Sequence, residues 1–268
     1  MAFTTASSAG KVCLVVGLGG QGIGDHVAKK FAKEGYRVAV CARTERNVLR
    51  LAEEINAAAA AGGNTNTNTT TPVCKAYTCD AVEMTQMKQT VAEVVKTFGT
   101  IDTAIYNAGA GVFKPFDQVT EEEFDMSLQV NCKGAFNLAK CVVPLMEGKK
   151  TGGVIGFTGA TASWRGMPFT PGFAPGKFAL RALSQALARD LGPKNIHVFH
   201  AIIDGVVQMP KTKDWMPNKP AEQFLPPADI ADCYWLSCCA KVSYSYCNHA
   251  LQIILLRANQ HYKFYFLC

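Results

Sequence analysis

The stretch Lys11-Val-Cys-Leu-Val-Val-Gly-Leu-Gly-Gly-Gln-Gly-Ile-Gly24 joins an apolar run to a cluster of glycines near the start of the chain. Lys11–Val16 has the length and composition of a β-strand, and Ile23, Val27 and Phe31 then recur at helical spacing. Glycines between a strand and a helix permit a turn that is too tight for other residues. The stretch therefore predicts a strand, a tight turn and a helix in immediate succession.

Apolar runs of strand length alternate with helical patterns along the rest of the chain. The other candidate strands are Tyr36–Cys41, Ile101–Tyr106, Gly153–Phe157 and Ile196–Ile203. Helical patterns lie at residues 84–98, 124–142 and 180–191. Such alternation is typical of proteins in which helices cover both faces of a parallel sheet. We therefore predict an α/β fold with a doubly wound parallel sheet of the Rossmann type, in a single domain.

Composition excludes several classes of protein. The 268-residue chain is 49% hydrophobic and 18% charged, unlike a disordered or collagen-like chain. Its net charge of +6 comes from scattered basic residues, too sparse for a nucleic-acid surface. No apolar run reaches the roughly 18 residues of a membrane helix. Eleven cysteines, with no secretory signal and no zinc-binding spacing, predict a cytoplasmic protein with reduced thiols and no metal.

Two segments depart from the α/β pattern. Ala58–Thr71 has low complexity, and we expect a flexible insertion in a surface loop. From Cys233 onward the chain holds five cysteines and no Asp or Glu, yet Leu251–Leu256 reads as a strand. We expect one domain over residues 1–232 and an atypical cysteine-rich tail over 233–268. The tail is either a divergent final strand or an ending produced by a frame shift or alternative splicing.

The glycine-rich turn has the spacing that binds a dinucleotide. Its glycines match G-x-G-x-x-G directly after a strand and at the start of a helix, where backbone N–H groups meet a pyrophosphate. The alternative is a turn whose glycines are only structural. The residues expected to bind the cofactor here are Gly17, Gly19, Gly20, Gly22, Ile23 and Gly24.

The end of the second strand predicts which dinucleotide binds. A carboxylate about 20 residues after the glycines favours NAD, because it binds the free 2′-hydroxyl of the ribose. This chain has Cys41-Ala42-Arg43-Thr44 there, with no carboxylate. A guanidinium suits a 2′-phosphate, so Arg43 favours NADP over NAD, unless it is an ordinary exposed arginine.

Two polar residues fall on apolar helical stripes. Asn131 lies within the stripe of residues 124–138, and Lys177 lies within the stripe of residues 173–187. A core amide or lysine needs a hydrogen-bonding partner, and either residue could simply have one. Two such residues in a chain that carries a dinucleotide loop instead indicate an active site.

Residues 11 to about 205 resemble the short-chain dehydrogenase/reductase family. The resemblance rests on the glycine loop at 17–24, Cys79-Asp80, Asn107-Ala108-Gly109, Asn131, and Phe173-Ala-Pro-Gly-Lys177 in the place of the family's Tyr-x-x-x-Lys. It implies that Asp80 lies near the adenine and that Asn107 to Gly109 lie near the ribose on the nicotinamide side.

The same resemblance implies catalytic roles and an assembly. Lys177 would bind that ribose and lower the pKa of a catalytic tyrosine, and Asn131 would hold a water of the proton relay. The helices around 124–145 and 178–191 would form a homodimer or homotetramer.

The chain departs from the family at the proton-transferring residues. Phe173 stands where the family has its tyrosine, and Ala160 stands where it has its serine. Thr158, Thr161 and Ser163 flank Ala160, and a shifted loop would present one of them. Two functions stay open. One is an NADP-dependent oxidoreductase of a small carbonyl or activated C=C substrate. The other is a catalytically impaired dinucleotide-binding scaffold or sensor.

Overall fold

A computed structural model of the chain describes residues 10–62, 71–239, 251–258 and 261–267. Its centre is a sheet with the strand order β3-β2-β1-β4-β5-β6-β7-β8, parallel throughout except where β8 pairs with β7. The strands are β1 Val12–Val16, β2 Arg37–Ala42, β3 Cys74–Thr78, β4 Thr103–Tyr106, β5 Gly153–Thr158, β6 Ile196–Ile203, β7 Leu251–Ala258 and β8 His261–Leu267. The predicted doubly wound parallel sheet is confirmed.

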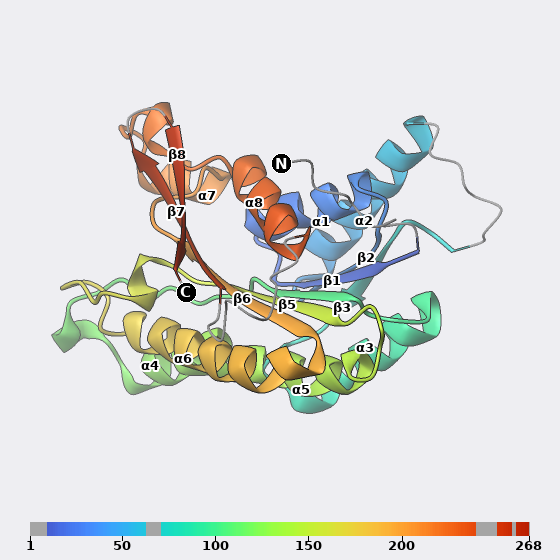
Figure 1. Cartoon of the computed structure of the whole chain (residues 1–268). Helices are drawn as coiled ribbons and strands as arrows, with labels where there is room; N and C mark the ends of the chain where they lie inside the picture. Colours follow the sequence, from blue (N-terminus) through green and yellow to red (C-terminus); the bar gives the residue numbers. More distant parts are fainter. Residues whose placement is uncertain (1–9, 63–70, 240–250, 259–260, 268) are drawn as a thin grey trace.

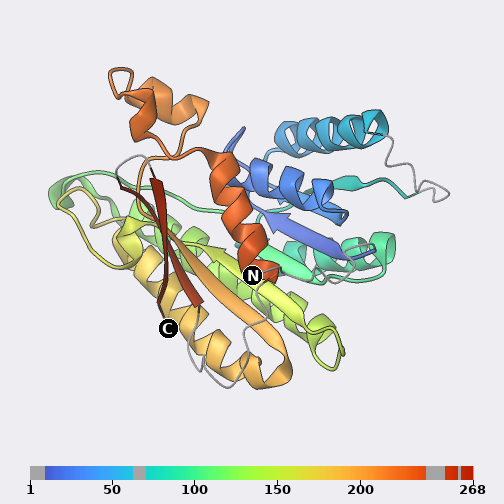
Figure 2. The same ribbon diagram turned by 45° about the horizontal axis from the view of Figure 1, so that its top comes forward.

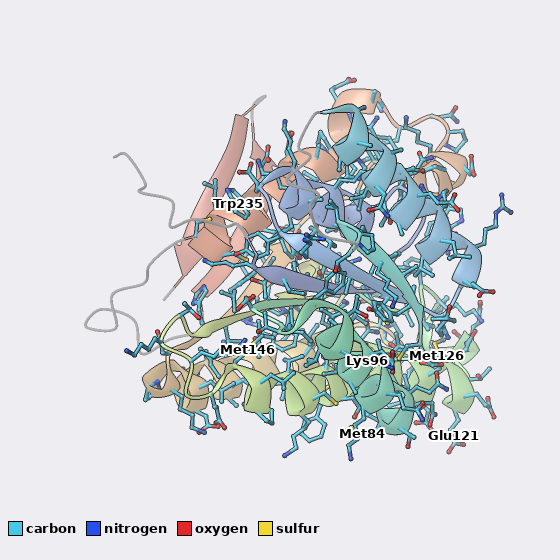
Figure 3. The ribbon with its side chains drawn as sticks, turned by 90° about the vertical axis from the view of Figure 1, so that its right-hand side faces the viewer. Met84, Lys96, Glu121, Met126, Met146 and Trp235 are labelled. Atoms are coloured by element: carbon cyan, nitrogen blue, oxygen red, sulfur yellow. The ribbon has the colours of Figure 1, made fainter. Side chains whose placement is uncertain are left out.

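Helices cover both faces of the sheet (Figure 1). One face carries α1 (Ile23–Lys33), α2 (Glu45–Ala61) and α8 (Pro227–Cys239); the other carries α3 (Met84–Phe98), α4 (Glu121–Leu128), α5 (Gly134–Met146) and α6 (Ala174–Leu191). In the side view of Figure 3, Trp235 of α8 lies on one side of the sheet, and Met84 and Lys96 of α3 lie on the other. Every residue of β1 is buried, because both of its faces are covered.

The helix α8 belongs to the core of the domain. It packs against α1 (Figure 2). Trp235 meets Phe31 and Tyr36 edge-on, with ring centroids 5.3 and 5.7 Å away, contacts worth about 0.5–1.5 kcal/mol each. The boundary expected at residue 233 therefore falls inside a helix that the core requires. The strand expected at 251–256 is β7, paired with β6.

Two local expectations need correction. The low-complexity segment was expected to be flexible from Ala58 onward, but α2 continues through Ala61, because alanine is the strongest helix former; residues 63–70 lie outside the described residues. The single helix expected over 124–142 is interrupted by a π-helical turn, η2 (Gln129–Lys133), between α4 and α5. Such turns are rare and occur often at functional sites.

The strand order creates one place where loops diverge. β1 lies between β2 and β4, and its last residue, Val16, pairs with Cys41 on one side and Tyr106 on the other. After β1 the chain turns to one face of the sheet, and after β4 it turns to the other. The loops therefore diverge at the carboxyl ends of these two neighbouring strands. Ligands of open α/β sheets bind in this crevice, at the carboxyl ends of the strands.

Candidate active site

A cavity of about 880 Å³ opens at the carboxyl ends of the central strands. Most residues singled out in the sequence line it: Gly17, Gly19, Gly22, Ile23, Arg43, Asp80, Asn107, Ala108, Gly109, Thr158, Ala160, Thr161, Phe173 and Lys177. Gly20, Gly24, Asn131 and Ser163 are not among its lining residues. We call the part around Gly19, Arg43 and Asp80 the glycine-loop end. The part around Phe113, Met167, Phe173 and Lys177 is the apolar end.

The glycine loop is packed tightly on one side and open on the other. Gly17 has φ +100°, and a Cβ there would lie 2.1 Å from the backbone nitrogen of Ala108; a Cβ on Gly24 would lie 2.3 Å from the Gly17 carbonyl oxygen. By contrast, a Cβ on Gly19 or Gly22 would meet only the Met209 side chain, no closer than 3.2 Å. The loop thus forms a cradle before the N-terminus of α1, which fits a pyrophosphate.

Asn107 holds this loop to the end of β5. Its Nδ2 donates to the Gly17 carbonyl oxygen at 2.7 Å, and its Oδ1 accepts from the Thr158 hydroxyl at 3.0 Å. The Tyr234 hydroxyl of α8 lies 2.7 Å from the same Thr158 oxygen. A chain of side-chain hydrogen bonds therefore runs from buried Tyr234 to the glycine loop. No sequence pattern pointed to Tyr234, because its partner is 76 residues away.

Asp25 is a second residue that sequence reasoning missed. It is fully buried in the first turn of α1. Its Oδ1 accepts from the backbone N–H of Gln21 at 2.9 Å and from the Arg50 guanidinium at 2.6 Å. Gln21 has φ +63°, a left-handed conformation that is costly outside glycine. Asp25 thus fixes the shape of the loop and ties it to α2.

The glycine-loop end carries the groups expected near an adenosine. Arg43 follows β2 directly, is exposed and lines the cavity. The Asp80 carboxylate accepts from the Val82 N–H at 3.1 Å, which fixes the turn after β3. Next to it, a hydrogen bond with Cys41 lowers the pKa of Cys79 to about 7. These residues and the open cradle fit a nicotinamide dinucleotide.

Asn131 lies in the π-helical turn and is completely buried. Its Nδ2 donates to the Ala110 and Ser127 carbonyl oxygens at 2.8 and 2.9 Å, and its Oδ1 accepts from the Ala110 N–H at 3.3 Å. An amide nitrogen has two protons, so both are engaged by the protein. In this arrangement Asn131 ties the loop after β4 to the helix and has no proton left for a water.

Lys177 lies on the second turn of α6, and its side chain reaches the cavity. Its Nζ donates to the Thr158 carbonyl oxygen at 2.9 Å and lies 5.7 Å from the centre of the Phe173 ring. The residue is 5% exposed, and burial lowers the pKa of its ammonium to about 8. Phe173 packs against Phe113, with 5.1 Å between ring centroids. At the apolar end an amine therefore lies beside aromatic rings.

The hydroxyl groups near Ala160 take different positions. Thr158 and Thr161 line the cavity, whereas Ser163 is fully buried and does not. Ser163 Oγ accepts from the Ala160 N–H at 3.1 Å and lies 3.5 Å from His200 Nε2. Ser163 ends the 3₁₀ turn η3 (Thr161–Ser163), and its hydroxyl caps that turn. The structure therefore brings two of these three hydroxyls to the cavity.

Over the part of the chain that the structure describes, no cluster of three or more His, Cys, Asp or Glu side chains is arranged to hold a metal ion. In those same ranges no helix combines the length and apolarity needed to cross a bilayer.

Comparisons with known proteins agree with this geometry. The family model for short chain dehydrogenases matches residues 11–219. A short-chain dehydrogenase/reductase of Armillaria gallica is 32% identical over 210 residues, covering 77% of this chain and 75% of that one. The 3-oxoacyl-[acyl-carrier-protein] reductase FabG of Thermotoga maritima is 29% identical over 216 residues, covering 81% of each chain.

Solved structures show the same architecture. A short-chain dehydrogenase from Rhodopseudomonas palustris superposes with a TM-score of 0.71 at 29% identity, over 93% of this chain and 99% of that chain. An alcohol dehydrogenase from Thermococcus sibiricus, complexed with 5-hydroxy-NADP, superposes with a TM-score of 0.74 at 24% identity, over 94% and 97% of the two chains. Fold, cavity and family match lead to one conclusion: the chain belongs to the short-chain dehydrogenase family.

Proposed function

We propose that this protein is an NADP-dependent oxidoreductase that transfers a hydride between NADP(H) and a small carbonyl or activated C=C substrate. One observation carries the proposal. A single cavity joins the glycine cradle and Arg43 at one end to the buried amine of Lys177 at the other. A lysine is almost never fully buried without a partner or a role, and a role beside the reacting end of a dinucleotide held by the glycine cradle would account for this one.

Arg43 supports NADP as the dinucleotide. It lines the cavity immediately after β2, and the Cys41–Thr44 segment holds no carboxylate that would favour a free 2′-hydroxyl. A charge-assisted hydrogen bond to a phosphate is worth about 1.5–3 kcal/mol, and exposure reduces this value toward its lower limit.

The residues of the site have separable roles. Asn107 and Asp25 hold the glycine loop in shape, and Asn131 holds the loop after β4. The apolar rings of Phe113 and Phe173 pack together beside Lys177 and favour an apolar substrate. When bound, the dinucleotide supplies or accepts the hydride.

The test combines binding and turnover. Purified protein is titrated calorimetrically with NADPH and with NADH, and NADPH oxidation is followed on a panel of ketones, aldehydes and enones. We expect NADPH to bind at least about tenfold more tightly than NADH, with turnover on members of the panel. Failure to bind either dinucleotide would overturn the proposal.

A catalytically impaired scaffold or sensor is the second candidate. Phe173 and Ala160 both line the cavity, and neither side chain has a proton to transfer. A positioned general acid typically contributes about 10²–10⁴-fold in rate. Tight NADPH binding with no turnover on any substrate of the panel would favour this candidate.

We also propose a homodimer or homotetramer formed through α4, α5 and α6. Large apolar side chains on these helices are exposed: Phe124, Met126, Phe136 and Phe178. Light scattering during size-exclusion chromatography measures the mass, and a monomer at micromolar concentration would contradict the assembly.

A further inference from the structure

The departure at Phe173 raises the question of which group supplies the proton. The Thr158 hydroxyl is the first group that could replace the tyrosine, but it already has two hydrogen-bond partners. It donates to Asn107 Oδ1 at 3.0 Å, and because a hydroxyl has one proton, the Tyr234 hydroxyl must be the donor across the 2.7 Å contact. Thr158 therefore serves the glycine loop rather than the substrate.

Three other threonines that line the cavity donate to protein acceptors, and Thr44 lies at the glycine-loop end. The Thr161 hydroxyl donates to Asp204 at 2.6 Å, and the Thr170 hydroxyl donates to the Met167 carbonyl oxygen at 3.0 Å. The Thr212 hydroxyl donates to the carbonyl oxygen of Val207 or Met209. Ser163 does not line the cavity. Each of these protons could be given up only by breaking an existing hydrogen bond.

Most of the titratable side chains that line the cavity are also unsuitable as the proton donor. Arg165 stays charged at any physiological pH and pairs with Asp204 at 3.1 Å. The Tyr106 hydroxyl donates to the Val130 carbonyl oxygen at 2.6 Å, and burial raises its pKa. Arg43, Cys79 and Asp80 belong to the glycine-loop end. Among the lining residues, this leaves Lys177 at the apolar end.

Lys177 has protons to spare in a suitable place. An ammonium has three N–H donors, and one donates to the Thr158 carbonyl oxygen, its one hydrogen-bond partner among the described residues. A second can meet the ribose hydroxyl that the family resemblance assigns to Lys177, which leaves the third for a substrate. The Nζ also faces Gly109, where a Cβ would lie 3.4 Å away. Glycine at that position keeps the approach to the amine open.

The groups packed around Lys177 do not hold it as a permanent cation. β5 contributes the Thr158 carbonyl, and the π-helical turn contributes the neutral amide of Asn131. β6 contributes His200, whose pKa falls to about 3 through burial and through the charges of Lys177 and Arg181. His200 is therefore neutral near pH 7, and no carboxylate pairs with Lys177 among the described residues. Burial alone lowers the pKa of Lys177, to about 8.

We propose that the Lys177 ammonium, rather than a hydroxyl, delivers the proton to the reduced substrate. The inference rests on the proposed function. A carbonyl that has accepted a hydride at carbon carries the displaced electron pair on its oxygen. That pair takes a proton from Nζ, the N–H bond breaks, and Lys177 is left as a neutral amine until water protonates it again. The Phe173 ring lies 5.7 Å from Nζ and leaves the amine in contact with the cavity, through which water reaches it.

The first test reads the proton on Lys177 without any turnover. Protein labelled with ¹³C at the lysine Cε is titrated by NMR, and the spectrum of Lys177→Arg assigns the signal. We expect one lysine signal to titrate near pH 8, well below the signals of the exposed lysines. The wild-type spectrum alone shows whether such a lysine exists, so the test stands even if the variant does not fold. If no lysine titrates below about pH 10, the pKa of Lys177 is not matched to proton transfer near neutral pH, and the proposal is overturned.

The second test is the pH dependence of carbonyl reduction. The acid must be protonated to act, so wild-type turnover should fall as pH rises through about 8. Lys177→Arg keeps the charge but does not titrate in this range. We expect it to lower turnover by about hundredfold and to remove the fall, whereas Lys88→Arg, an exposed control on α3, should change neither. Wild-type turnover with the same fall in Lys177→Arg would overturn the role of Lys177. Absence of turnover in the wild type would instead overturn the proposed function, and the NMR titration would still report on Lys177.

Discussion

The two ends of the cavity are built differently. At the glycine-loop end, backbone and side chains are cross-linked by hydrogen bonds: Asn107 to Gly17, Asp25 to Gln21 and Arg50. At the apolar end, Phe113 packs on Phe173, and the large side chains of Phe113 and Met167 line the cavity while more than half exposed. One end is rigid and polar, and the other is apolar and open.

This contrast shows that binding a dinucleotide and transferring a proton make separate demands on a site. The glycine loop works only if its backbone geometry is fixed, so its supports are many and buried. Proton transfer depends on one group with a suitable pKa at the right place. Phe173 removes that group without disturbing any support of the loop, and Lys177 remains beside it.

The largest expected effect is at the rigid end. In Gly24→Ala the new Cβ would lie 2.3 Å from the Gly17 carbonyl oxygen and 2.9 Å from Asn107 Nδ2, so the loop must move. Overpacking of this kind costs about 3 kcal/mol, and a displaced cradle should weaken NADPH binding more than about hundredfold. Thermal unfolding and calorimetric titration measure the two effects.

Gly62→Ala is the matched control for this change. Gly62 has an ordinary φ, and its nearest neighbour across the new Cβ would be the Ala58 carbonyl oxygen at 3.4 Å, far from the cavity. Both measurements should stay at their wild-type values. Unchanged NADPH affinity in Gly24→Ala would show that the loop adapts, and the contrast between the two ends would fail.

At the apolar end, restoring a hydroxyl should increase activity. Phe173→Tyr places a phenol within reach of Lys177, whose Nζ is 5.7 Å from the ring centre, and a positioned acid contributes about hundredfold or more. Because Lys177 would already supply a proton, we expect turnover of a carbonyl substrate to rise by less than this full factor, with NADPH affinity unchanged. Phe169→Tyr, which adds a hydroxyl to an exposed ring in the same loop, should have no effect. No gain in Phe173→Tyr would indicate that the apolar end is not organised for carbonyl reduction.

A substitution of Arg43 tests whether the glycine-loop end distinguishes NADPH from NADH. Arg43→Ala removes the guanidinium that faces the expected 2′-phosphate, so NADPH affinity should fall about tenfold while NADH affinity holds. Arg46→Ala removes an equally exposed arginine outside the cavity lining and controls for net charge. Equal losses for both dinucleotides in Arg43→Ala would contradict the assignment to the phosphate.

The sequence predicted what depends on local patterns. The glycine loop, the strand before it and the helix after it are neighbours in sequence, and so the G-x-G-x-x-G spacing was enough. Asn131 and Lys177 stood out in the sequence because a polar residue on an apolar stripe is costly unless it has a partner or a role, and of the two only Lys177 lines the cavity. Arg43 was expected near the cofactor because it comes directly after the second strand, about 20 residues after the glycine-rich turn.

What the sequence missed depends on the tertiary structure. Asp25 looks like an ordinary acidic residue in the first turn of a helix, and only the fold brings Arg50 to it. Ser163 and Thr161 were equivalent as sequence neighbours of Ala160, yet the 3₁₀ turn buries one and exposes the other to the cavity. The π-helical turn at Asn131 likewise has no pattern that distinguishes it from an α-helix.

The smallest effect tests the link from α8 to the glycine loop. Tyr234→Phe keeps the ring that packs on Phe199, with 5.5 Å between centroids, but removes the hydroxyl that donates to Thr158. The loss of one buried hydrogen bond costs about 1 kcal/mol of stability. Because Thr158 orients Asn107 on the loop, NADPH affinity should also fall, by about threefold. Tyr77→Phe is the matched control, since the Tyr77 hydroxyl also pairs with a threonine, Thr97 at 3.1 Å, outside the cavity lining. If both variants lose stability but neither loses NADPH affinity, the hydrogen bond of Tyr234 stabilises the fold alone, and the rigidity of the loop comes from Asn107 and Asp25 without help from α8.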